Sequence, residues 1–103
     1  MLLLDNDDSL PVEPAEDELT FAIEIGDQGV ITIDATLTLH ARPLWLKGAR
    51  IIHDALATGG FPISDGAVHF HARRIMALVR SGALEGQGNL HKPRSSEVRL
   101  PPV

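Results

Sequence analysis

The chain has 103 residues, 44% of them hydrophobic, which suits a single globular domain with a modest core. It contains no cysteine, so a disulfide framework and thiolate metal sites are excluded. The formal net charge is −5 and is unevenly placed: residues 1–34 hold ten acidic groups and no Lys or Arg, and residues 35–103 hold four acidic and nine basic groups. This asymmetry can indicate an acidic tail beside a basic binding face, but it is more commonly the mark of a solvated, disordered start.

Residues 1–18 predict an acidic, flexible tail, because carboxylates and prolines are frequent there and favour solvation over regular structure. The apolar run 2–4 leads directly into Asp5 and lacks the basic leader and long apolar core of a signal peptide. No run approaches the roughly 20 apolar residues of a membrane span. We therefore expect a cytoplasmic protein with no membrane partner and one domain over residues 19–103.

Residues 19–39 predict a β-hairpin. Phe21, Ile23 and Ile25 alternate with other residues, and the sequence Gly-Asp-Gln-Gly at 26–29 is typical of a turn. The β-branched content of the segment favours strand over helix. The second strand is the longer one, so its far end needs another partner, either the C-terminal ribbon or a second subunit. One face of this strand would carry the apolar residues Ile31, Ile33, Ala35, Leu37 and Leu39.

Two helices are expected next. The first covers 43–58, with Pro43 in the first helical position and a Gly-Gly pair at 59–60 ending it. The second covers 64–81, where Ser64 or Asp65 can cap the start and Gly82 ends the helix. Its apolar stripe has helical spacing and consists of Val68, Ala72, Ile75, Met76 and Val79.

Extended runs at 84–85 and 97–100, separated by a loop rich in turn-forming residues, predict a C-terminal β-ribbon. The expected fold class is therefore α+β: an N-terminal β-hairpin, two helices in helix-turn-helix-like order, and a winged-helix-like ribbon. The usual first helix of the helix-turn-helix motif is missing from this arrangement, because strands stand in its place. That absence weakens the inference of DNA binding.

The end of the chain also resembles a known family. The pattern is Arg74-xxx-Leu78-xxx-Gly82-x-Leu84-Glu85-xx-Gly88, followed by Arg94-x-Ser96-Glu97-Val98-Arg99-Leu100. It resembles the closing module of a family of small bacterial proteins catalogued as a domain of unknown function. The resemblance covers roughly the last third of the chain. It implies a shared helix-plus-ribbon scaffold and carries no activity.

Basic residues gather in two places and form the candidate binding face. His69, Arg73 and Arg80 fall on one side of the second helix, away from its apolar stripe, and His91, Lys92 and Arg94 crowd the ribbon loop. A basic helix face beside a basic loop is what phosphate contacts require. The competing interpretation is an ordinary solvated face, because the net charge of the chain is negative.

No pattern predicts a catalytic, metal or cofactor site. His69 and His71 are two residues apart on a helix and do not face each other, and no His-Glu-x-x-His or Gly-x-Ser-x-Gly motif occurs. The ribbon could bring Glu85 and Glu97 opposite each other, but Arg94 and Arg99 beside them favour surface ion pairs.

The sequence thus favours a small, non-enzymatic bacterial interaction module. We expect it to act as a homodimer, or with another protein, through strand edges and helix faces. A winged-helix nucleic-acid-binding regulator is the alternative.

Overall fold

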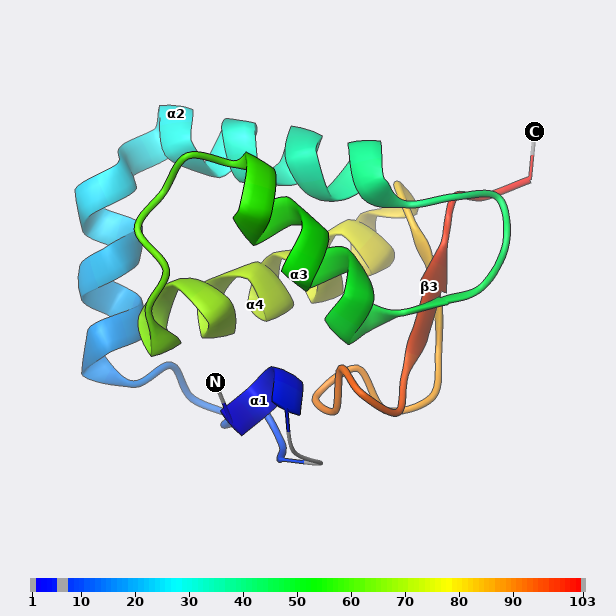
Figure 1. Cartoon of the computed structure of the whole chain (residues 1–103), viewed down its shortest axis with the longest axis horizontal. Helices are drawn as coiled ribbons and strands as arrows, with labels where there is room; N and C mark the ends of the chain where they lie inside the picture. Colours follow the sequence, from blue (N-terminus) through cyan, green and yellow to red (C-terminus); the bar gives the residue numbers. More distant parts are fainter. Residues whose placement is uncertain (1, 6–7, 103) are drawn as a thin grey trace.

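Helices make up most of the structure, a computed structural model that describes residues 2–5 and 8–102. Figure 1 shows the long helix α2 bent around one side of the molecule, with α3 and α4 against it and the strands at one end. Residues 1, 6, 7 and 103 lie outside the described part, so the predicted tail is described only in part. In chain order the elements are α1 (Leu2–Asp5), α2 (Glu16–His40), β1 (Leu46–Lys47), α3 (Gly48–Thr58), α4 (Asp65–Ser81), β2 (Glu85–Gln87) and β3 (Glu97–Arg99).

The predicted N-terminal β-hairpin is wrong, and the predicted fold class is wrong with it. Residues 19–39 lie inside helix α2, so the helices come first and the ribbon strands after them. Gly29, Ile33 and Leu37 are buried four residues apart, which is helical spacing. The threonines that suggested strands are accommodated in the helix, because three of their hydroxyls donate to the carbonyl four residues earlier.

The turn expected at 26–29 corresponds to a sharp kink in α2. Gly26 has φ 65° and ψ −172°, a conformation that side chains bearing a Cβ avoid. The kink divides α2 into a first half before Gly26 and a second half after it, and the two halves run in different directions in Figure 1. The sequence predicts strands in place of the first helix of a helix-turn-helix motif. A helix, α2, precedes α3 and α4, so this expectation is also wrong.

Helix α4 forms where its sequence pattern places it. The Ser64 Oγ accepts a hydrogen bond from the Ala67 amide at 3.1 Å, and Gly82 ends the helix in the left-handed conformation with φ 86°. The helix predicted over 43–58 begins later, at Gly48, because Leu46 and Lys47 pair with β3 as a strand. Pro43 is therefore outside the helix. The helix ends at Thr58, directly before the Gly-Gly pair that was expected to end it.

The C-terminal ribbon is present, and β1 joins it. The antiparallel sheet has the order β1-β3-β2, with Leu46 opposite Val98 and Glu85 opposite Arg99. Val98, in the central strand, is fully buried. Since β1 leads directly into α3 and β2 follows α4 after the short turn 82–84, the sheet holds together the start of α3 and the end of α4.

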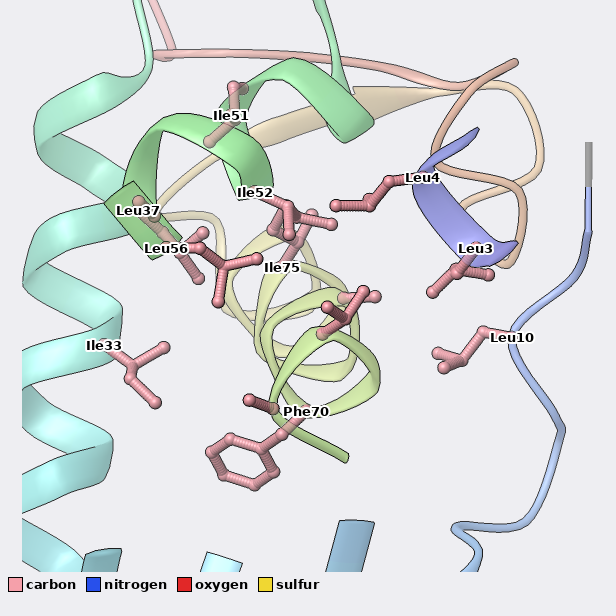
Figure 2. Packing of buried hydrophobic residues seen from close by; sticks show 14 of the residues in the cluster. Leu3, Leu4, Leu10, Ile33, Leu37, Ile51, Ile52, Leu56, Phe70 and Ile75 are labelled. Carbon is pink, nitrogen blue, oxygen red and sulfur yellow. The ribbon is translucent and has the colours of Figure 1, made fainter. Parts of the chain in front are cut away.

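The core includes residues from the predicted tail. Figure 2 shows Ile33 and Leu37 of α2 pointing in from one side and Leu3, Leu4 and Leu10 from the other, with α3 and α4 between them. These three N-terminal leucines are all buried. The boundary expected at residue 18 falls inside α2, which begins at Glu16. Flexibility of the segment stays a prediction, but its leucines belong to the core.

Candidate functional site

The residues of the predicted basic face lie in two separate parts of the structure. His69 and Arg73 lie one turn apart on α4, and Arg80 is exposed in the last turn of the same helix. His91, Lys92 and Arg94 lie in the loop between β2 and β3. The structure links the two groups through the N-terminal segment 8–12, which we call the N-terminal strap: both Arg73 and His91 bind it.

Arg73 is fully engaged by carboxylate and carbonyl oxygens. Its Nε and Nη2 donate to the two oxygens of Glu18 at 2.9 and 2.8 Å, and its Nη1 donates to the carbonyls of Pro11 and Val12 at 2.9 and 3.2 Å. Glu18 is only 2% exposed. Its hydrogen bonds raise the pKa of Arg73 further above the ordinary value, so the guanidinium stays charged while a buried carboxylate neutralises it.

The loop side of the predicted face is also occupied by the strap. The Leu10 amide donates to the His91 carbonyl at 2.6 Å, and the His91 Nδ1 lies 2.9 Å from the Leu10 carbonyl. Because a carbonyl can only accept, that ring nitrogen carries the proton. The Leu10 side chain is buried between these contacts. The N-terminal strap therefore bridges α4 and the loop.

His69 and His71 have different surroundings, as their spacing predicts. His69 borders a small cavity of about 300 Å³ that Asp8, Ser9 and Asp65 also line. His71 is 1% exposed, and its Nδ1 donates to the Ala67 carbonyl at 2.7 Å. Burial lowers the pKa of His71 below its ordinary value, and the hydrogen bond raises it by less. His71 is therefore a neutral residue of the core. The described residues contain no group of three His, Asp or Glu side chains placed to hold a metal ion.

The ribbon carboxylates form separate pairs. The Arg99 Nε donates to Glu85 at 2.7 Å, and Glu97 accepts from the Gln87 amide at 2.7 Å. The Arg99 guanidinium also lies 4.4 Å from the ring centroid of Trp45. The register places Glu85 opposite Arg99 and Glu97 opposite Gln87, so the two carboxylates do not face each other.

A second ion pair, which sequence reasoning missed, fixes α4 to the other half of α2. Arg74 donates to both oxygens of Asp34 at 2.9 and 2.8 Å. Arg73 and Arg74 are adjacent, yet they bind carboxylates on opposite sides of the Gly26 kink. Nothing in the sequence marks these partners, because they are 55 and 40 residues away along the chain.

The most distinctive surface is one that the strand interpretation had placed in the core. Ile31 and Leu39 are 60% and 71% exposed, and Ala35 between them is also exposed. These three residues are four apart, so they form one apolar stripe on the second half of α2, which we call the α2 stripe. Helical spacing was the signal that could have revealed it. Beside the stripe lies a groove of about 710 Å³, bordered by Ala35, Leu39, Arg42, Pro43 and Leu100 among others.

No family model, curated protein or solved structure matches this chain. The resemblance to a domain of unknown function therefore stays a prediction. Within residues 2–5 and 8–102, none of the helices combines the length and apolar character needed to cross a bilayer.

Proposed function

We propose that this protein is a non-enzymatic interaction module that pairs with a second copy of itself through the α2 stripe. The observation that carries the proposal is the exposure of Ile31 and Leu39 on either side of the small residue Ala35. Large apolar side chains in a continuous exposed row are typical of association surfaces. The row occupies a regular helix, which offers a rigid face to a partner.

The stripe is self-complementary in an antiparallel arrangement. If two α2 helices cross at Ala35, the small side chains let the backbones approach, and Ile31 of each copy meets Leu39 of the other. Both residues lie about 6 Å along the helix from Ala35. The groove beside Leu39 is where the incoming Ile31 would insert. A two-fold interface of this kind uses the same surface on both copies.

Charges at the ends of the stripe support the same arrangement. Asp27 is exposed near the start of the second half of α2, and Arg42 is exposed just beyond its end. The Arg42 guanidinium folds back onto the helix, donating to the carbonyls of Leu39 and Ala41. In an antiparallel pair, Asp27 of one copy would approach Arg42 of the other at both ends of the interface.

The helix face is a better candidate than the strand edges. The sheet leaves β1 and β2 at its edges, and these strands have two and three residues. Edges this short offer few free backbone groups to a partner strand. Association through α2 therefore replaces the strand pairing expected from the sequence.

Sedimentation velocity of the full chain tests the proposal. We expect a dimer that persists at high salt, because its centre is apolar and only its ends are charged. Ala35→Glu should give a folded monomer, since it places two carboxylates at the crossing point. Ile23→Glu is the matched control, because Ile23 is 81% exposed on the other half of α2. A wild-type monomer at every concentration, or equal dimerisation of both variants, would contradict the proposal.

Nucleic-acid binding, the alternative, has less support. Arg73 is neutralised by Glu18, and the strap contacts both Arg73 and His91. Displacing the strap would expose the apolar surface that Leu10 covers, together with the basic groups. Gel mobility with a DNA duplex at low salt tests it. We expect no shift, whereas a complex weakened by Lys92→Ala with Arg94→Ala would favour the alternative.

A further inference from the structure

A separate hollow lies where the first half of α2 meets the connector between α3 and α4. It has a volume of about 890 Å³, within the range of small-molecule sites. Its apolar lining, which we call the floor, consists of Phe21, Ile25, Phe61 and Pro62. We call it the phenylalanine groove. Its α2 residues all precede the Gly26 kink, whereas the α2 stripe follows it, and no residue borders both the groove and the stripe's own hollow.

Aromatic packing holds the floor in place. The rings of Phe21 and Phe61 meet edge to face, with centroids 6.0 Å apart and an interplanar angle of 74°. Phe21 also packs on Phe70 of α4 at 5.8 Å. Phe21 is therefore fixed from both sides, and Phe61 remains half-buried at the groove. A ligand would meet a preformed aromatic surface.

The rim of the groove has one sign of charge. Glu16, Asp17 and Glu24 line it, and no Lys or Arg does. Glu16 and Asp17 belong to the first turn of α2, where carboxylates also stabilise the helix itself. Glu24 lies two turns further on, beyond the reach of that effect, and within the described residues it forms no ion pair. Its position at an apolar hollow is what a cationic ligand would use.

We propose that the phenylalanine groove binds a small amphipathic cation, an organic molecule in which an amine or quaternary ammonium group is attached to an apolar or aromatic body. The apolar body would lie on Phe21, Ile25 and Phe61. The rim carboxylates would hold the cation. The accessible face of the Phe61 ring would be a further contact for it. This site is independent of the α2 stripe.

A matched set of three probes tests this proposal on the full chain. They are 2-naphthylmethylammonium, 2-naphthylmethanol and 2-naphthoate, which share one aromatic body and differ in charge. Calorimetric titration at low salt should give an affinity for the cation about tenfold above that for the alcohol, with the anion weakest. The preference for the cation should shrink at moderate salt. Equal affinities for cation and anion would overturn the proposal.

Three variants locate the binding. Glu24→Gln should weaken the cation severalfold and leave the alcohol unchanged, and Glu24→Lys should reverse the preference between cation and anion. Glu13→Gln, an exposed acidic position that does not line the groove, is the control and should change nothing. Equal weakening by Glu13→Gln and Glu24→Gln would mean general attraction to an acidic protein and would overturn the site. So would unchanged cation binding in both Glu24 variants.

Discussion

The guanidinium of Arg73 binds both carboxylate oxygens of Glu18, which lies 55 positions earlier in the chain. The carboxylate is buried and the guanidinium is partly exposed. The pair fixes α4 to the first half of α2, and the same guanidinium holds the strap through the carbonyls of Pro11 and Val12. A residue that sequence analysis placed on a binding face is thus a connection between three segments of the fold.

Arg73→Ala should therefore destabilise the protein strongly. Removing the guanidinium leaves the buried Glu18 carboxylate without its partner, which costs about 3 kcal/mol of unfolding free energy. Arg80→Ala is the matched control on the same helix, and its exposed side chain predicts a change below about 0.5 kcal/mol. Urea denaturation of both variants checks the prediction. Equal, small changes would show that the ion pair contributes little.

Leu10→Ala should also destabilise, although Leu10 lies in a segment whose composition predicts a tail. Its side chain is 2% exposed, and truncating a buried leucine costs about 2–5 kcal/mol. Val12→Ala, two residues further and 79% exposed, is the control and should be nearly neutral. Thermal melts of the two variants give the comparison. If both melt like the wild type, the strap is not packed in solution.

Gly26→Ala should cost about 1–3 kcal/mol, because φ 65° with ψ −172° is a conformation that glycine alone adopts readily. Apart from the two neighbouring residues and the backbone of α2 itself, no atom lies within 4 Å of the position a Cβ would take, so the cost is conformational and involves no clash with another segment. A D-alanine at this position, introduced by chemical ligation, should restore stability because its preferred backbone angles are mirrored. Equal destabilisation by both alanines would indicate that α2 is not kinked this way.

Stability should fall as the pH is lowered below the ordinary pKa of histidine, through His71. Burial lowers its pKa in the folded state, so the unfolded chain binds more protons in the window between the lowered value and about 6.5. Within that window the loss is at most about 1.4 kcal/mol per pH unit, and below it this contribution stays constant. In urea titrations from pH 7 downward, the unfolding free energy of His71→Gln should therefore fall less steeply than that of the wild type. Parallel pH profiles for the two proteins would contradict the assignment.

Local signals predicted some elements well. Ser64, the stripe from Val68 to Val79 and Gly82 specify α4 through capping and spacing, which act within the helix itself. The extended runs around β2 and β3 were also recognisable. The start of α3 was misplaced because pairing of Leu46 with Val98, 52 residues away, decides it.

Helix α2 could not be recognised from alternation and β-branched content, because both are compatible with a helix when its burial repeats every four residues. The error moved Ile31 from the exposed surface into the expected core and so concealed the α2 stripe. The contacts of Arg73 on the predicted basic face could not be foreseen for a different reason: its partners, Glu18 and the strap, are brought in by tertiary folding. Their burial has no signature in the local sequence.

Cysteine cross-linking at Ala35 tests the central claim most directly, since the chain has no cysteine of its own. In the antiparallel pair, residue 35 of each copy lies at the two-fold axis, within reach of its counterpart. Ala35→Cys should form a disulfide-linked dimer rapidly at micromolar concentration under mild oxidation, and Ile23→Cys, equally exposed but outside the stripe, should remain largely monomeric. Equal cross-linking of both variants would contradict association through α2. So would a folded Ala35→Cys variant that forms no disulfide-linked dimer.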